Sequence, residues 1–283
     1  MDEPKITKIP TEIFGYAYTD HSEHAKRALR EQYCPFLDGE CKKPRKSNPK
    51  VKIGACSVGY NAGVIKKHQP VVICPHRLDT PIIFHTIEQQ YLRDWPDVEW
   101  IREVSIGVGG SVDYVAINRD NTGKIKDFLC VEFQAAGTTG TPWEAILEFK
   151  ENREFKSTTY NYGINWANEF VKTMMQQVFK KGKIIEYWKH KIIFVVQDVG
   201  MDYIKYATDA SGIRAADPND PIHFCTFRLV WKDTKWAFEF VERVSTDLDG
   251  INKILGGALE EEYPSVVKFV ENIERKVTQA LKK

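Results

Sequence analysis

No apolar run in the chain approaches the roughly 20 residues that a membrane-spanning helix needs. The N-terminal residues also lack the basic and then apolar pattern of a secretory signal. We therefore expect a cytoplasmic protein without a membrane partner. Its 283 residues, 42% hydrophobic and 28% charged, are typical of a globular chain with one large domain or two modest ones.

Acidic residues are absent from Cys41 through Leu78. The cations in this stretch are Lys42, Lys43, Arg45, Lys46, Lys50, Lys52, Lys66, Lys67 and Arg77. A basic block of this kind attracts phosphates through charge neutralisation and counterion release, although a solvated basic loop has the same composition. The formal net charge of +1 does not decide between the two interpretations.

Cysteine pairs with the two-residue spacing of a zinc ribbon are lacking, yet four cysteines cluster. Six, fourteen and seventeen residues separate Cys34, Cys41, Cys56 and Cys74, and each lies within two residues of a proline or glycine. Clustered cysteines in a reducing cytosol indicate metal rather than disulfides. The pattern predicts a structural four-thiolate site for iron or zinc, with buried free thiols as the alternative.

The segment around these cysteines, residues 34–78, is rich in turn-forming residues. It has too little apolar periodicity to make its own core, so we expect a partner or a metal to hold its shape. His68 and His76 are possible replacements for a cysteine ligand, although surface or phosphate-facing roles fit them as well. Cys130 and Cys225 stand alone in strand-like stretches.

Hydrophobic periodicity predicts a mixed α/β order, with a central sheet flanked by helices. The expected strands are residues 100–106, 111–118, 126–134, 192–196, 222–231 and 236–244. The expected helices are residues 22–33, 86–95, 165–181, 201–208, 247–256 and 264–281. A turn at residues 121–123 indicates a hairpin between the second and third strands.

Two acids lie on the strands of that hairpin. If the turn is centred between Thr122 and Gly123, Asp113 lies opposite Glu132, and Gln134 shares the face of Glu132. Two half-buried like charges repel at a cost of several kcal/mol in order of magnitude, unless something pairs them. A Mg²⁺ ion, which prefers one or two carboxylates, would do so. The alternative is an Asp113 at a strand rim and a Glu132 that faces solvent.

The segments on either side of the acid pair suit a phosphate. Small residues at 107–110 would let a bulky ligand approach the backbone. Residues 138–141, with the sequence TTGT, offer hydroxyl and amide groups for phosphate contact.

Taken together, the cysteine block and the acid pair resemble the NotI-type restriction endonuclease family, the relatives of NotI and EagI. The resemblance is carried by Phe14-Gly15-Tyr16, Cys34-Pro35-Phe36, Cys41, Gly54-Ala55-Cys56-Ser57-Val58, Ile73-Cys74-Pro75-His76-Arg77-Leu78, Ser111-Val112-Asp113-Tyr114 and Val131-Glu132-Phe133-Gln134. It covers most of residues 14–145 and is weaker beyond them.

This resemblance implies a nuclease fold of the PD-(D/E)xK superfamily. Residues 1–80 would form an N-terminal segment with the metal site and DNA contacts, and residues 81–283 the nuclease core and C-terminal helices. Asp113 and Glu132 would bind Mg²⁺, and Gln134 would stand where the usual lysine does. Since Gln134 is neutral, it could orient the attacking water but could not supply the charge of a lysine.

The resemblance further implies an iron-loaded four-cysteine site, a homodimer and a GC-rich palindromic target in double-stranded DNA. It also implies a cognate DNA methyltransferase in the same restriction-modification system. The chain would then be a type II site-specific deoxyribonuclease. The expected base-reading cations lie near Arg45 or Arg77, because bidentate pairing to guanine is the commonest specific contact.

Three questions stay open. A further active-site acid is expected ahead of Asp113, with Glu103 preferred over Glu99 and Glu88. Helices at residues 165–181 and 264–281 are candidates for the dimer contact. Two other functions remain possible, a non-enzymatic zinc-containing nucleic-acid-binding protein and a structure-specific repair nuclease.

Overall fold

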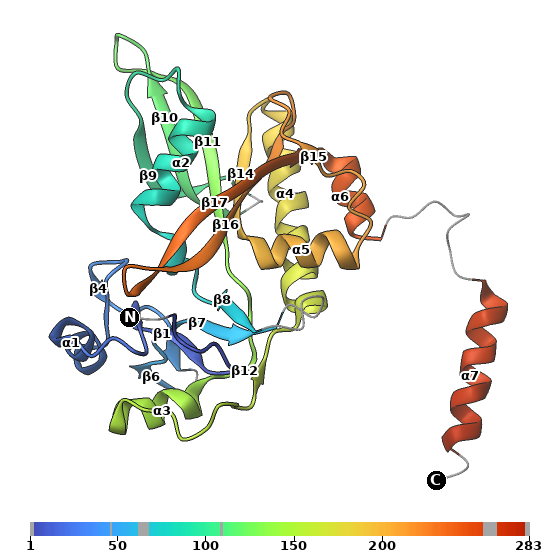
Figure 1. The fold of residues 1–283 in the computed structure, drawn as a ribbon. Helices are drawn as coiled ribbons and strands as arrows, with labels where there is room; N and C mark the ends of the chain where they lie inside the picture. The colour runs from blue at the N-terminus through green and yellow to red at the C-terminus, as the bar shows by residue number, and fades with distance from the viewer. Residues whose placement is uncertain (1–2, 46, 62–67, 108–109, 257–264, 281–283) are drawn as a thin grey trace.

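A computed structural model describes residues 3–45, 47–61, 68–107, 110–256 and 265–280. The described part is a mixed α/β structure built on a seven-stranded sheet with the strand order β15-β17-β16-β14-β11-β10-β9 (Figure 1). Its strands are β9 (Glu99–Ser105), β10 (Ser111–Arg119), β11 (Ile125–Gln134), β14 (Ile192–Gln197), β15 (Arg214–Ala215), β16 (Ile222–Lys232) and β17 (Lys235–Thr246). Strands β11, β14 and β16 run parallel, and the other neighbours are antiparallel.

Helices cover both faces of this sheet, which explains why every residue of β14 is buried. On one face lie α4 (Thr173–Tyr187), α5 (Asp198–Ala207) and α6 (Leu248–Ile254), which share an apolar cluster with Ile192, Phe194 and Val196 of β14. On the other face lies α2 (Pro81–Tyr91), which packs with Ile193 and Val195. The alternating side chains of one strand thus serve two separate cores.

The sequence predicts most strands of this sheet and most helices closely, but it misplaces one helix and misses another. Helix α2 begins at Pro81, where proline suits the first turn, rather than at residue 86. The predicted helix at 165–181 is a π-helix, Trp166–Lys172, followed by α4. A helix that the sequence did not indicate, α3 (Trp143–Asn152), buries Trp143 and Ile146.

The N-terminal part has a sheet of its own, with the order β2-β1-β7-β8. Its strands are β1 (Pro10–Ile13), β2 (Tyr16–Ala17), β7 (Ala55–Tyr60) and β8 (Gln69–Val72). Around it lie α1 (Glu23–Glu31), capped by Ser22 as predicted, the short hairpins β3 (Tyr33–Cys34) with β4 (Gly39–Glu40) and β5 (Pro44–Arg45) with β6 (Asn48–Lys52), and the 3-10 turn η1 (Pro75–Leu78).

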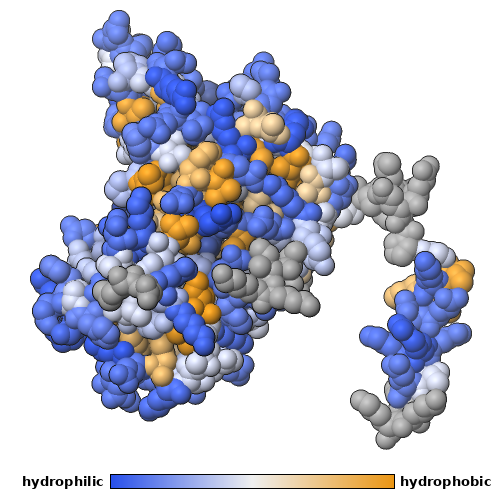
Figure 2. All heavy atoms as spheres, viewed as in Figure 1, coloured by the Kyte–Doolittle hydropathy of each residue, from blue (hydrophilic) through white to orange (hydrophobic). Residues whose placement is uncertain are grey.

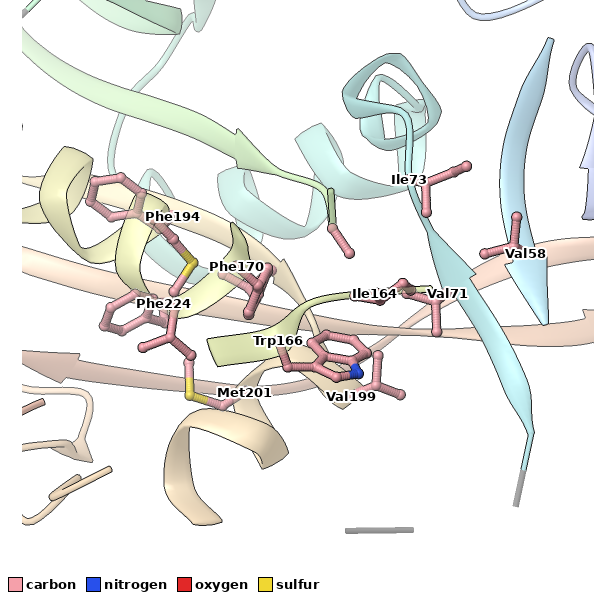
Figure 3. Close-up of a cluster of buried hydrophobic side chains, with 14 of the residues drawn as sticks. Val58, Val71, Ile73, Ile164, Trp166, Phe170, Phe194, Val199, Met201 and Phe224 are labelled. Carbon is pink, nitrogen blue, oxygen red and sulfur yellow. The ribbon is translucent and has the colours of Figure 1, made fainter. Parts of the chain in front are cut away.

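Residues 34–78 find their partner inside the chain. Val58, Val71 and Ile73 point into the same apolar cluster as Ile164 and Trp166 from the segment before α4 (Figure 3). The periodicity of β7 and β8 is hard to see in the sequence because these strands are short and interrupted by glycine and proline. Packing against the body therefore supports this segment.

A buried glutamine joins the two sheets. The side chain of Gln197, at the end of β14, accepts a hydrogen bond from Val72 N at 2.8 Å and donates one to Pro70 O at 2.6 Å. Ala136 N, just beyond β11, donates to Val72 O at 2.9 Å. Strand β8 is thereby fixed at the carboxyl ends of the parallel strands β11 and β14.

A buried ion pair makes the second junction. Arg77 Nε lies 2.9 Å from both carboxylate oxygens of Glu12, and Arg77 Nη2 donates to Trp236 O at 2.8 Å. Ser57 Oγ donates to Glu12 Oε2 at 2.7 Å. The guanidinium also lies over the ring of Phe238, 4.7 Å from its centroid. Both charges are therefore neutralised and hydrogen-bonded where water is excluded.

The last described helix, α7 (Val266–Ala280), stands apart from the body (Figure 1). Its apolar side chains Val266, Phe269, Val270 and Ile273 are exposed, and Figure 2 shows an orange patch at one end of the helix. Among the described residues, none of the helices combines the length and apolar character required to cross a membrane. Whether α7 takes part in a dimer stays a prediction.

Replacing Arg77 with alanine should lower the free energy of unfolding by about 3–5 kcal/mol, because Glu12 would remain as a buried charge without its partner. Urea denaturation measures the change. Lys26→Ala is the control, because Lys26 pairs with Glu23 at the surface and its loss should cost less than about 1 kcal/mol. Equal effects of the two substitutions would contradict this role for Arg77.

Candidate functional site

The hairpin of β10 and β11 brings two carboxylates together at its open end. Tyr114 pairs with Val131, so the next residues along, Asp113 and Glu132, oppose each other in the register that the sequence predicts. Asp113 N donates to Glu132 Oε2 at 3.3 Å, and Phe133 N donates to Asp113 Oδ2 at 2.7 Å. These backbone donors hold the two acids side by side.

Both acids are unfavourably placed as anions. Glu132 is 6% exposed and Asp113 is half-buried. Burial raises the pKa of the Asp113 carboxyl. Burial also raises the pKa of Glu132, and the neighbouring charge of Asp113 raises it further. A site that concentrates negative charge away from water is suited to a divalent cation, and Mg²⁺ needs only one or two carboxylates besides water.

Two residues of α4, which the sequence did not single out, complete the site. The Lys181 ammonium forms an ion pair with Glu132 Oε1, and its side chain is almost fully buried. Gln177 Oε1 accepts a hydrogen bond from Gln134 Nε2 at 3.2 Å. Residues four apart share one face of a helix, so Gln177 and Lys181 reach the sheet together. This spacing is visible in the sequence, but the direction of that face depends on packing.

Glu103 lies beside Asp113 on the edge strand β9. Its neighbours Arg102 and Val104 pair with Tyr114 and Val112, which brackets Asp113. The charge of Glu103 contributes to the raised pKa of Asp113. Glu103 has a φ of 52°, a left-handed conformation that is strained for a side chain other than glycine and that occurs often at functional sites.

The two rivals of Glu103 have structural partners. Glu99 Oε2 accepts a hydrogen bond from Arg119 Nε at 2.9 Å. Glu88 Oε1 accepts one from Trp100 Nε1 at 2.8 Å. The geometry therefore favours Glu103 as the additional acid.

Gly107 and Gly110 lie between β9 and β10. Gly107 and Gly110 have φ values of 73° and 90°, and a Cβ at either position would meet nothing within 4 Å. Backbone conformation, not crowding, therefore requires glycine here. Val108 and Gly109 lie outside the described residues. In the segment 138–141, the strand β12 (Thr139–Gly140) is exposed and pairs with β13 (Tyr162–Gly163).

The four clustered cysteines are all buried, and backbone amides lie close to three of them. The backbone amides two and three residues after Cys34 partly offset the rise that burial causes in the pKa of its thiol, and the same holds for Cys74. Gly15 N donates to Cys56 Sγ at 3.3 Å. Each Cys-Pro turn thus presents two amides to one sulfur, an arrangement that stabilises a thiolate.

The sulfurs also influence one another. Burial is the largest cause of the raised pKa of Cys34, Cys56 and Cys74, and neighbouring thiols of the cluster raise each of them further. The Lys43 ammonium donates a hydrogen bond to Ile73 O at 2.6 Å. It is close enough for electrostatic interaction with three of the four cysteine sulfurs. A cation beside several buried thiols offsets part of the charge of their ionised forms.

No group of three or more His, Cys, Asp or Glu side chains converges closely enough to hold a metal ion among the residues described. The four sulfurs therefore share an environment, with amide donors and a lysine, but not the closed geometry of a loaded site. His76, considered as a substitute ligand, is placed near the acid pair instead, where the charges of Asp79 and Asp113 oppose the lowering of its pKa by burial.

The basic block divides into inward and outward side chains. Arg77 is buried in its ion pair with Glu12, so the expectation that it reads bases is wrong. Arg45 lies over Trp143, 4.8 Å from the ring centroid. Lys42 and Lys50 are exposed and free to meet a phosphate backbone. Lys46, Lys66 and Lys67 lie outside the described residues.

Comparison of the chain with family models, with curated proteins and with solved structures gives no match. The proposed function therefore rests on the geometry of the chain's own side chains.

Asp113→Asn should raise the melting temperature of the metal-free protein while removing divalent-cation binding. Burial raises the pKa of this carboxyl in the folded protein above its pKa in the unfolded chain, so the ionised form destabilises the fold. The free energy of unfolding therefore increases as the pH falls from above the folded-state pKa to the unfolded-state pKa. Asparagine keeps an oxygen for Phe133 N and removes the charge. A gain of about 1 kcal/mol corresponds to a rise of about 2–4 °C.

Calorimetric titration with Ca²⁺ measures whether Asp113→Asn has lost divalent-cation binding. Ca²⁺ is used because it binds oxygen ligands without supporting most hydrolyses. Asp127→Asn is the matched control, because Asp127 lies on β11 at the far end from Glu132. An Asp113→Asn protein that melts lower and binds Ca²⁺ as the wild type does would contradict a cation seat at this position.

Proposed function

We propose that the chain is a type II restriction endonuclease that hydrolyses phosphodiester bonds of double-stranded DNA with Mg²⁺. The observation that carries the proposal is the opposition of Asp113 and Glu132 on adjacent strands, with Gln134 following on the same strand. Two anions brought together at a partly buried site have no evident structural benefit. A cation beside a phosphate explains their placement.

The topology agrees with the PD-(D/E)xK nuclease fold. The antiparallel strands β9, β10 and β11 are followed by α4 and then by β14, which pairs in parallel with β11. The acids lie where this meander ends, at the carboxyl end of β11, and ligands of open α/β sheets bind at such ends. The proposed site and the sheet that carries it are thus consistent with each other.

A bound Mg²⁺ ion would supply the Lewis acidity that lowers the pKa of a water molecule and offsets charge on the phosphate. Asp113 and Glu132 would hold the ion, and Glu103 would add a third acid at the edge. Gln134 would orient the attacking water through its amide. The exposed Lys42 and Lys50 would contact the DNA backbone, together with the amides and hydroxyls of residues 138–141.

For specificity we extend the proposal to a GC-rich palindrome cut by a homodimer, since a two-fold symmetric target requires two symmetric sites. A cell that contains such a nuclease needs a cognate methyltransferase to protect its own DNA. Arg45 remains the candidate for base reading, and α7 offers an exposed apolar face for association between copies.

The four cysteines would hold a structural iron or zinc ion that closes residues 34–78 beside the active site. Three features favour this role: the burial of all four thiols, the paired amide donors at Cys34 and Cys74, and the Lys43 ammonium. The position of η1 next to the acid pair would then link metal binding to the placement of His76. The described geometry would need the sulfurs to draw closer on loading.

Purified protein should cut a long DNA of known sequence into discrete fragments with Mg²⁺, and Asp113→Ala should reduce the rate by at least about 1,000-fold because the cation seat is lost. Gel analysis with sequenced fragment ends measures both effects. A smear would indicate a structure-specific or unspecific nuclease. Full cutting by Asp113→Ala would reject the catalytic assignment, and DNA binding without cutting would favour a non-enzymatic binding protein.

Cys56→Ser should release the structural metal and make residues 34–78 sensitive to proteolysis, because one of four thiolates would be missing. Cys225→Ala is the control, since Cys225 is buried in β16 away from the cluster. Elemental analysis for iron and zinc, with limited proteolysis, measures the outcome. Less than about half an equivalent of metal in the wild type would speak against the site.

A further inference from the structure

A positive charge is missing from the strand that carries the proposed active site. Gln134 stands two residues after Glu132, and its amide has no charge with which to stabilise an anion. In the nuclease pattern that the chain resembles, a lysine stands at this place. Either the reaction proceeds without such a cation, or another part of the fold supplies it.

Helix α4 places a lysine at the required location. Lys181 is 6% exposed, and its ammonium forms an ion pair with Glu132 Oε1. Its charge also acts on the Asp113 carboxylate. Gln177, one turn earlier on the same face, contacts the amide of Gln134 at 3.2 Å. The side chains of Gln177 and Lys181 therefore reach Gln134 and Glu132 on β11, although 46 residues of chain lie between Gln134 and Lys181.

The close approach of α4 to the sheet explains how this lysine reaches the acids. A Cβ at Gly182 would lie 2.5 Å from Ile222 Cδ1, so a larger residue there would force the Ile222 side chain to move. Met174, Met175, Val178 and Ile185 are buried along the same helix. A helix anchored on both sides of Lys181 holds the ammonium in a defined position, which catalysis requires.

We propose that Lys181 is a catalytic residue of the nuclease and supplies from helix α4 the positive charge that Gln134 does not supply from the strand. The inference rests on the proposed nuclease function. Burying an ammonium costs several kcal/mol in order of magnitude unless partners offset the cost, and Glu132 is the partner that the described structure provides. When a divalent cation occupies the acids, the ammonium is left to face the phosphate and the attacking water.

The step itself is an ordinary hydrolysis. The oxygen of water forms the new bond to phosphorus, the bond from phosphorus to the leaving oxygen breaks, the attacking water releases a proton to solvent, and the leaving oxygen takes a proton from solvent. Lys181 keeps its proton throughout. Its ammonium donates a hydrogen bond to a non-bridging phosphate oxygen or to the attacking water, and thereby lowers the energy of the charged transition state.

The alternative is that Lys181 only neutralises the two carboxylates while no divalent cation is bound. Saturating Mg²⁺ would then take over that task, and loss of the lysine would not slow the chemical step. We therefore compare single-turnover cleavage at saturating Mg²⁺ for the wild type, Lys181→Met and the control Lys183→Met, whose lysine is exposed on the same helix. Calorimetric Ca²⁺ binding without DNA shows whether each protein retains its folded acid pair.

We expect Lys181→Met to bind Ca²⁺ at least as tightly as the wild type, since a competing cation is removed, and to cleave about 100- to 1,000-fold more slowly. Lys183→Met should match the wild type in both measurements. A rate for Lys181→Met within about threefold of the wild type at saturating Mg²⁺ would overturn the inference.

A second variant tests the charge directly and also covers a Lys181→Met protein that fails to fold. Gln134→Lys in the Lys181→Met background returns the lysine to the strand, next to the vacated space, and should recover at least about tenfold of the lost rate. A folded double variant with no recovery would overturn the inference. If the wild type itself does not cleave DNA, the proposed function is wrong. If the wild type cleaves and Lys181→Met cleaves equally fast, only the role of Lys181 is wrong.

Discussion

The repulsion between two carboxylates across one strand pair is the constraint on which the site depends. Asp113 and Glu132 oppose each other in the β10–β11 hairpin, and backbone amides fix both in place. Burial raises the pKa of each, so the folded protein maintains a costly arrangement that Lys181 offsets only in part. Sites that bind cations or do chemistry tolerate such costs, because the ligand or the transition state removes them.

The rest of the fold holds that arrangement against relaxation. Gln197 and Arg77 join the N-terminal sheet to the central sheet through buried hydrogen bonds and one buried ion pair. Because these contacts fix β8 and η1 beside the ends of β11 and β14, the cysteine-bearing segment and the acid pair form neighbouring surfaces. Under the proposed function, a DNA duplex that contacts both surfaces would meet the exposed cations and the acids together.

Much of the central sheet can be predicted from the sequence, because period-two patterns and turn residues encode strands locally. The hairpin register follows from its turn, and Asp113 opposite Glu132 follows from that register. Other features cannot be predicted in this way. The sequence predicts that Arg77 faces DNA, but Arg77 is buried against Glu12, which lies 65 residues away in the chain. Strands β7 and β8 are too short to give a clear period, and they are stabilised by distant partners.

The sequence by itself determined the strand order along the chain, the acid pair and the clustering of four cysteines, because these depend on local spacing. Only the tertiary structure decided which cations face inward, how the cysteine segment docks and that Lys181 reaches Glu132. Those features depend on contacts between residues far apart in the chain, such as the close packing of Gly182 against Ile222 and the ion pair of Lys181 with Glu132. A helix pattern states which side chains share a face, but the direction in which that face points is a property of the whole fold.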